Sequence, residues 1–235
     1  MRLDKLLAGA GLTRAQAKRA VADGRATVNG AVARDPGMRV DGADVRLDGR
    51  SVAPPGDVFL MLNKPAGVLS AVSDAREPTA FSLLPEEARR RSPSPVGRLD
   101  RDVTGLLLFT THGELLHRLT SPRYAVEKAY IAHVEGTPDA QDVQRLAAGV
   151  ELSDFTARPA RLEVLAEGLV RLTVTEGRHH EVKRLLAAVG HPVTALMRER
   201  MGGVALDAAL PPGGSRPLTD EEVARLFRAA RLERN

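Results

Sequence analysis

Residues 94–110 read SPVGRLDRDVTGLLLFT, and the apolar run near the end of this stretch limits how the chain can fold. Residues 106–109 are all Leu or Phe, and the turn-forming residues 110–113 follow them. A short apolar run that ends in this way is typical of a strand buried on both faces. Four charged residues stand directly before the run: Arg98, Asp100, Arg101 and Asp102. Carboxylates at the mouth of a buried strand do not stabilise it, so we expect a function there.

The composition is that of a folded chain without membrane spans. Of its 235 residues, 43% are hydrophobic and 27% are charged, and no apolar stretch approaches the roughly 20 residues that span a bilayer. The N-terminal residues MRLDKLLAGAGLTRAQ lack the apolar block of a secretory signal, so we expect a cytoplasmic protein that does not bind membranes. The chain has no cysteine, which excludes disulfides, a thiolate nucleophile and cysteine-ligated zinc.

Positive charge is concentrated in the first quarter of the chain. Residues 1–53 hold ten Lys and Arg against six Asp and no Glu, whereas the remaining 182 residues hold 24 charges of each sign. This asymmetry predicts an N-terminal module that binds nucleic acid.

The pattern of the N-terminal module predicts two short helices followed by strands. Leu3, Leu6 and Leu7 have helical spacing, and Thr13 is an N-cap for a second helix over 14–22. Arg14 and Lys18 share one face of that helix, with Arg25 just beyond it. A hairpin around Asn29-Gly30 and a strand at 44–49 follow. We predict an RNA-binding domain over 1–53, a linker over the Pro- and Gly-containing residues 54–57, and a catalytic domain over 58–235.

The catalytic domain mixes strands and helices, which predicts an α+β fold. Strands are expected at 58–63, 106–109, 129–136 and in a hairpin over 161–177. Helices are expected at 86–91, 114–119, 139–148, 179–189 and 219–231.

Three polar clusters lie beside these elements, at 98–102, 127–130 and 176–184. The chain has 29 Arg and only five Lys, yet Lys128 and Lys183 fall in these clusters and Lys64 stands at the turn after the strand expected at 58–63. His179 and His180 are a conceivable metal pair, but adjacent side chains diverge and no second ligand cluster exists. We therefore expect no metal at this site.

The motifs LNKPAGV, VGRLDRDVTGLLLFT, SPRYAVEKAY and EGRHHEVKRLLAAVG, in this order, closely resemble the pseudouridine synthases. The resemblance is to the bacterial ribosomal branch typified by RsuA. Residues 2–35 similarly resemble the S4-like RNA-binding domain that this branch carries. The resemblance implies a small S4-like α/β domain followed by a catalytic domain with a mixed, mainly antiparallel sheet and flanking helices.

The resemblance also implies roles for individual residues. Asp100 is the expected catalytic carboxylate, Tyr130 the aromatic that stacks on the target base, and Lys183 the cation beside Asp100. Arg98 is expected to hold the loop or the flipped-out nucleotide. The candidate RNA-binding residues are Arg2, Arg14, Lys18, Arg19, Arg25, Arg98 and Arg178.

The implied reaction needs no cofactor. Uridine becomes pseudouridine when the N1–C1′ bond breaks, the base turns, C5 joins C1′ and the C5 proton leaves. A carboxylate can do the central work by covalent addition or by acting as a base at the sugar, and the sequence does not choose between these routes.

The expected substrate is one uridine of 16S rRNA, of the position-516 type, in free RNA or a 30S assembly intermediate. We expect the protein to act as a monomer. Glu181 stands where small-subunit enzymes of this branch often have Gln, which keeps 23S rRNA open as the alternative. A non-catalytic RNA-binding assembly factor is a second alternative. A glycosidase with Asp100 and Asp102 as its carboxylate pair is a third, although aromatics make up only 3% of the chain.

Overall fold

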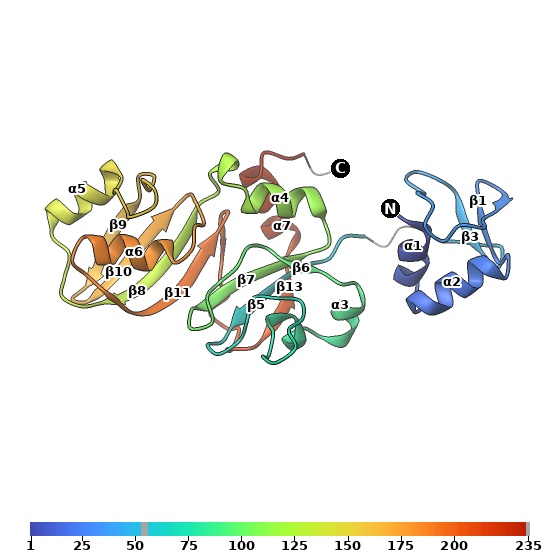
Figure 1. Ribbon diagram of the computed structural model, residues 1–235, viewed down its shortest axis with the longest axis horizontal. Coiled ribbons are helices and arrows are strands. Elements are labelled where there is room, and N and C mark those ends of the chain that lie inside the picture. Colours follow the sequence, from blue (N-terminus) through green and yellow to red (C-terminus); the bar gives the residue numbers. More distant parts are fainter. Residues whose placement is uncertain (53–55, 234–235) are drawn as a thin grey trace. The chain divides into compact units, whose positions relative to one another are not determined.

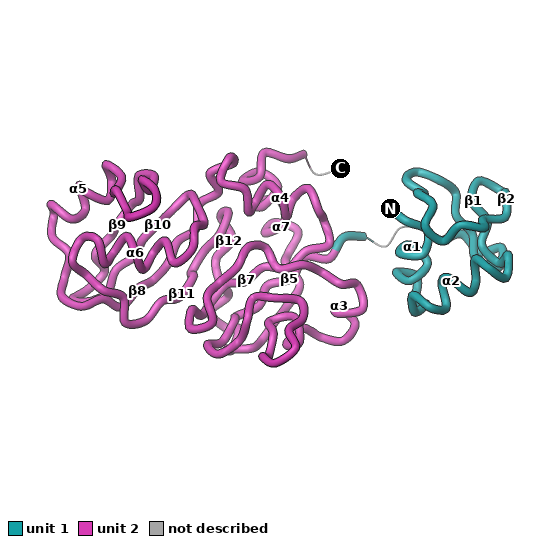
Figure 2. Tube along the Cα trace, in the orientation of Figure 1, with its two compact units in different colours: residues 1–57 teal, residues 58–235 magenta. Residues whose placement is uncertain are grey.

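The computed structural model describes residues 1–52 and 56–233 of the chain (Figure 1). The chain forms two compact units, residues 1–57 and residues 58–235 (Figure 2). Of the expected linker, residues 54 and 55 lie outside the described residues.

The first unit contains two short helices and a small antiparallel sheet. Its elements are α1 (Leu3–Gly9), α2 (Arg14–Ala22), β1 (Ala26–Val28), β2 (Ala31–Val32), β3 (Val45–Leu47) and β4 (Arg50–Ser51). Thr13 caps α2 through a capping box, since its Oγ1 accepts the Gln16 N–H and its own N–H donates to Gln16 Oε1. The strand order is β2-β1-β3-β4. Asn29 and Gly30, both at positive φ, make the turn between β1 and β2, as predicted from the sequence.

The second unit is built on one mixed sheet. Its strands are β5 (Phe59–Lys64), β6 (Ser94–Pro95), β7 (Thr104–Thr110), β8 (Lys128–Val134), β9 (Arg161–Ala166), β10 (Leu169–Val174), β11 (Val193–Met201), β12 (Val204–Ala205) and β13 (Ser215–Pro217). The main order is β13-β5-β7-β11-β8-β10-β9, with β12 beside β11 and β6 beside β7. Within residues 56–233, β7 and β11 form the one parallel pair, so the sheet is mixed and mainly antiparallel, as expected.

Helices cover both faces of this sheet. They are α3 (Glu86–Arg90), α4 (Gly113–Thr120), α5 (Ala140–Ala148), α6 (Glu181–Ala188) and α7 (Asp220–Ala229), with 3-10 turns η1 (Ala80–Leu83) and η2 (Pro122–Tyr124). Helices α5 and α6 pack on the face reached by Leu107 and Phe109. Helices α4 and α7 pack on the other face, reached by Leu106 and Leu108. None of the helices in the described part of the chain is long and apolar enough to cross a bilayer.

The apolar run of β7 is explained by these two cores. Successive side chains of a strand point to opposite faces, so a strand in the middle of the sheet buries all of them. The structure confirms the strand predicted at 106–109, which forms the centre of β7. It also places the charged residues 98–102 in the loop that leads into this strand.

The sequence pattern did not predict β11, although this strand is central in the sheet. Its sequence VTALMRERM does not alternate regularly, and its pairing with β8 shifts register twice, at residues 193/195 and 198/200. One inward position is Arg198, which is 1% exposed. A buried arginine and two irregularities hide the period of two that identifies a strand.

The parallel pair leaves no room for a side chain at Gly105. Gly105 lies opposite Arg198 and has a φ of 95°. An added Cβ would overlap the backbone oxygen of Arg198 and lie 2.6 Å from Met197 Cγ. Only glycine therefore lets β7 and β11 approach at this point.

We predict that Gly105→Ala lowers the free energy of unfolding by on the order of 3 kcal/mol, because overlap adds to the cost of positive φ. Gly190→Ala is the matched control, since Gly190 has a φ of 93° but open space around it, and its cost should be only about 1 kcal/mol. Urea unfolding of the full chain measures both values. Equal losses in the two variants would contradict the steric argument.

Candidate active site

One pocket of the second unit brings together five of the site residues proposed from the sequence. It is lined by the loop before β7, by β8, by the start of α6 and by β11. The five residues are Arg98, Asp100, Tyr130, Arg178 and Lys183. We call this the seam pocket, because it lies where β7 and β11 meet.

A buried lysine holds the loop that carries Asp100. Lys64, at the end of β5, is 0% exposed. Its Nζ donates to the backbone oxygens of Val103 at 2.8 Å, Pro65 at 3.0 Å and Arg101 at 3.3 Å. Burial lowers the pKa of Lys64 to about 8. The bonds to Arg101 and Val103 fix the backbone on the C-terminal side of Asp100.

Two basic side chains from the start of α6 face the Asp100 carboxylate. Lys183 Nζ lies 3.8 Å and His180 Nε2 3.5 Å from Asp100 Oδ2. His180, at the N-cap of α6, has a φ of 53°, and its ring stacks on His179. The Asp100 side chain is 31% exposed, so a substrate can reach it.

Lys183 has a closer partner than Asp100. Its Nζ donates to both carboxylate oxygens of Asp102, at 2.7 and 2.9 Å. This hydrogen bond is the largest cause of the lowered pKa of Asp102. Lys183 therefore lies between two carboxylates, whereas the sequence reasoning paired it with Asp100 alone.

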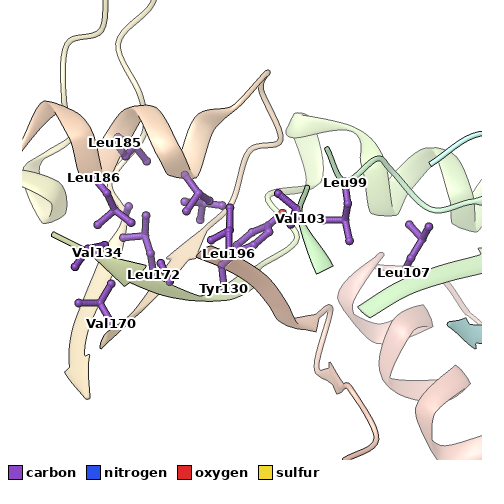
Figure 3. Packing of buried hydrophobic residues seen from close by; sticks show 14 of the residues in the cluster. Leu99, Val103, Leu107, Tyr130, Val134, Val170, Leu172, Leu185, Leu186 and Leu196 are labelled. Carbon is purple, nitrogen blue, oxygen red and sulfur yellow. The ribbon is translucent and has the colours of Figure 1, made fainter. Parts of the chain in front are cut away.

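Tyr130 presents its ring from the central strand β8. The residue is 8% exposed and belongs to the same core as Leu99, Val103 and Leu196. In Figure 3 its ring extends from β8 toward Val103, with Leu196 beside it. The ring is therefore held rigidly on the Asp100 side of the sheet.

A second buried lysine, Lys128, ties β8 to the loop that follows β10. Its Nζ donates to the backbone oxygens of Glu176 at 2.7 Å and Val126 at 3.0 Å. Burial, followed by the positive charge of Arg198, lowers the pKa of Lys128 to about 8. In the same loop, Arg178 stacks over the Phe155 ring and bonds to the buried Glu176 carboxylate.

Glu181 begins α6 and is 5% exposed. Burial, with a smaller contribution from the negative charge of Glu176, raises the pKa of the Glu181 carboxyl. Its side chain lines the seam pocket beside Lys183 and Arg178. Glu181, the residue that kept 23S rRNA open as an alternative substrate in the sequence analysis, is thus part of the site.

The other RNA-binding candidates lie in the first unit. Three are ion-paired there: Arg2 with Asp4, Arg19 with Asp23, and Arg25 with Asp48. Arg14 and Lys18 are exposed on α2, one turn apart, as predicted from the sequence.

Three features of the site were not predicted from the sequence. Arg198 lines it from the strand that was not predicted. His180 was considered only as a metal ligand, and the backbone bonds of Lys64 have no sequence signature. The scarcity of lysine in the chain was the one available signal for Lys64 and Lys128.

In the described part of the chain, no group of three or more His, Asp or Glu side chains is arranged to hold a metal ion.

Comparison with known proteins agrees with this geometry. Residues 58–188 match the RNA pseudouridylate synthase family, and residues 1–51 match the S4 domain. The chain is 44% identical to the ribosomal small subunit pseudouridine synthase A of Escherichia coli K12, over 95% of this chain and 99% of that protein. The chain belongs to the RNA pseudouridine synthase family. It is also 41% identical to the uncharacterized RNA pseudouridine synthase YtzG of Bacillus subtilis, over 95% of this chain and 97% of that protein.

A solved structure supports the same membership. The crystal structure of a pseudouridylate synthase matches with a TM-score of 0.68 and 34% identity, over 96% of this chain and 99% of that one. The chain is therefore an isomerase that converts uridine in RNA to pseudouridine. The alternatives of a glycosidase and of a non-catalytic assembly factor are not supported.

The buried lysines predict how stability depends on pH. Lys64 has a pKa of about 8 in the fold against an ordinary value of 10.5. The unfolded chain thus binds more protons between these values, and the free energy of unfolding rises with pH across this window. At about 1.4 kcal/mol per pKa unit, Lys64 contributes up to about 3 kcal/mol to the rise.

We expect Lys64→Met to reduce this rise, as measured by urea unfolding at pH 8 and pH 10. Lys5→Met is the control, because Lys5 is exposed in the first unit and should leave the rise unchanged. If the free energy of unfolding rises equally with pH in wild type and in Lys64→Met, the pKa of Lys64 is not lowered by burial, and the argument is contradicted.

Proposed function

We propose that this pseudouridine synthase isomerises a single uridine of 16S rRNA, of the position-516 type, with Asp100 as the catalytic carboxylate. The observation that carries the proposal is the seam pocket itself. It holds an accessible Asp100 next to two basic side chains and a rigid Tyr130 ring.

Asp100 acts when the N1–C1′ bond of the target uridine breaks. The electron pair of that bond leaves with N1 of the base. In one route an Asp100 oxygen bonds to C1′, and in the other Asp100 takes the C2′ proton while C1′ and C2′ form a double bond. Both routes start from an ionised carboxylate, and Lys183 supplies positive charge next to it.

Tyr130 holds the base while it turns. An aromatic ring fixed in the core offers a flat surface on which the free base can rotate without leaving the pocket. C5 then bonds to C1′, and the C5 proton must be removed to restore the aromatic ring. The Tyr130 hydroxyl is the candidate group for handling this proton.

Exposed arginines are proposed to position the RNA. Arg98 and Arg178 stand at the pocket and are exposed, where they can bind phosphates flanking the flipped nucleotide. Arg2, Arg14, Lys18, Arg19 and Arg25 of the first unit are proposed to bind RNA phosphates elsewhere. This division corresponds to an RNA-binding domain over 1–53 and a catalytic domain over 58–235.

The small-subunit substrate is favoured by the relative whose name specifies the ribosomal small subunit, which is 44% identical to this chain. All uridines present the same atoms to Asp100, so the RNA must be selected by its shape outside the pocket. We propose that the protein acts as a monomer in the cytoplasm, on a 30S assembly intermediate in preference to free RNA.

The substrate is tested with purified full-length protein and in vitro transcribed rRNA. Tritium release from C5-labelled 16S and 23S rRNA, followed by mapping, should give one pseudouridine in 16S rRNA and none in 23S rRNA. The yield should be higher with a reconstituted particle. A single modified site in 23S rRNA would assign the protein to the large-subunit alternative.

Asp100→Asn should abolish isomerisation in the same assay, because an amide can neither attack C1′ nor take a proton. Asp102→Asn is the matched control: Asp102 shares Lys183 but is exposed at the rim of the loop. We expect it to keep activity within about tenfold of wild type, the loss of one partly screened ion pair. Equal inactivity of both variants, or an active Asp100→Asn, would contradict the assignment.

A further inference from the structure

Arg198 of β11 lines the seam pocket, and one nitrogen of its guanidinium group, Nη2, is buried without a hydrogen-bond partner in the described part of the chain. The residue is 1% exposed, and its Nε donates to the backbone oxygen of Leu106 at 2.8 Å. Within residues 1–52 and 56–233, no acceptor contacts the buried Nη2. An unpaired buried donor costs roughly 1–3 kcal/mol, and more when it is charged. Such groups are few in native proteins, and a role in catalysis is one of the reasons why they are retained.

The position of Arg198 indicates which part of the substrate it serves. Arg198 is the direct cross-strand neighbour of Tyr130, and paired residues of an antiparallel ladder point to the same face. Both residues line the pocket that contains Asp100. The guanidinium group therefore lies beside the ring on which the base is proposed to stack.

The reaction moves negative charge toward that ring. Before cleavage, one negative charge is on Asp100. After cleavage, Asp100 is an ester or a neutral acid, and the electron pair of the N1–C1′ bond has given the charge to the base. The total charge is unchanged and the result is the same for both routes. The free base then needs a cation, and Lys183, on the Asp100 side of the pocket, faces the carboxylates of Asp100 and Asp102 instead.

We propose that Arg198 binds the uracil base once it has left C1′, and stabilises the negative charge on its ring. The N–H groups of the guanidinium donate to a carbonyl oxygen of the base, where the charge of the anion is shared. This inference rests on the proposed role of Asp100.

Burial excludes an RNA phosphate as the partner of Arg198. A phosphate remains on the RNA chain, outside the pocket, where the exposed Arg98 and Arg178 can reach it. Only a flipped-out base can approach a residue that is 1% exposed.

The test uses the full chain and single-turnover tritium release from C5-labelled 16S rRNA. Arg198→Gln keeps an N–H donor but loses the charge, and its rate should fall by about 100-fold, the typical effect of removing one stabilising donor from an anion site. Arg198→Lys keeps the charge and should lose only about tenfold. The dissociation constant for RNA should stay within about threefold of wild type, because the free base exists only after binding.

Arg200→Gln, two residues along the same strand and exposed, is the control and should react at the wild-type rate. A wild-type rate for Arg198→Gln, or Arg198→Lys no faster than Arg198→Gln, would overturn the inference. If Arg198→Gln does not fold, a wild-type rate for Arg198→Lys overturns it. An active Asp100→Asn, by contrast, would overturn the proposed function itself.

Discussion

At Gly105, β7 and β11 run parallel so closely that no side chain fits between them. This contact joins the strands β13, β5 and β7 to the strands β11, β8, β10 and β9. The residues of the site come from both sides of the junction. Asp100 precedes β7 on one side, and Tyr130, Arg198 and α6 lie on the other. The geometry of the site therefore depends on how closely these two strands approach.

Three buried cations lie at the pocket or behind the loop that carries Asp100: Lys128 and Arg198 line the pocket, and Lys64 binds the loop. Lys64, Lys128 and Arg198 are at most 6% exposed, and in the described part of the chain their hydrogen bonds go to backbone oxygens and not to carboxylates. A compact ammonium group suits sites where two or three carbonyl oxygens converge, which accounts for lysine there in an arginine-rich chain. Such burial costs stability, as the lowered pKa values of both lysines show. The cost is consistent with a site that must stabilise negative charge.

Much of this architecture could be predicted from the sequence, because many elements follow simple patterns. The run at residues 106–109 predicted a buried strand, Thr13 predicted the start of α2, and Asn29-Gly30 predicted a hairpin turn. The motif around Asp100 identified the family. These are local signals, which depend on residues close together in the chain.

The rest could not be predicted, because it depends on residues far apart in the sequence. Arg198 is buried only because Gly105, 93 positions earlier, admits its strand. Lys183 bonds to Asp102 across 81 positions, and motif resemblance alone favoured Asp100 as its partner. Lys64 stabilises the loop through backbone oxygens, which any residue type provides.

The most direct test of this account is a crystal structure of the inactive Asp100→Asn protein bound to a 16S rRNA fragment that contains the target uridine. The account predicts a flipped-out base stacked on Tyr130, with a carbonyl oxygen facing the Arg198 guanidinium. It also predicts C1′ about 3–3.5 Å from the side chain of residue 100, as expected for a complex ready to react. A target base that remains stacked in the RNA, or one bound outside the seam pocket, would contradict the account.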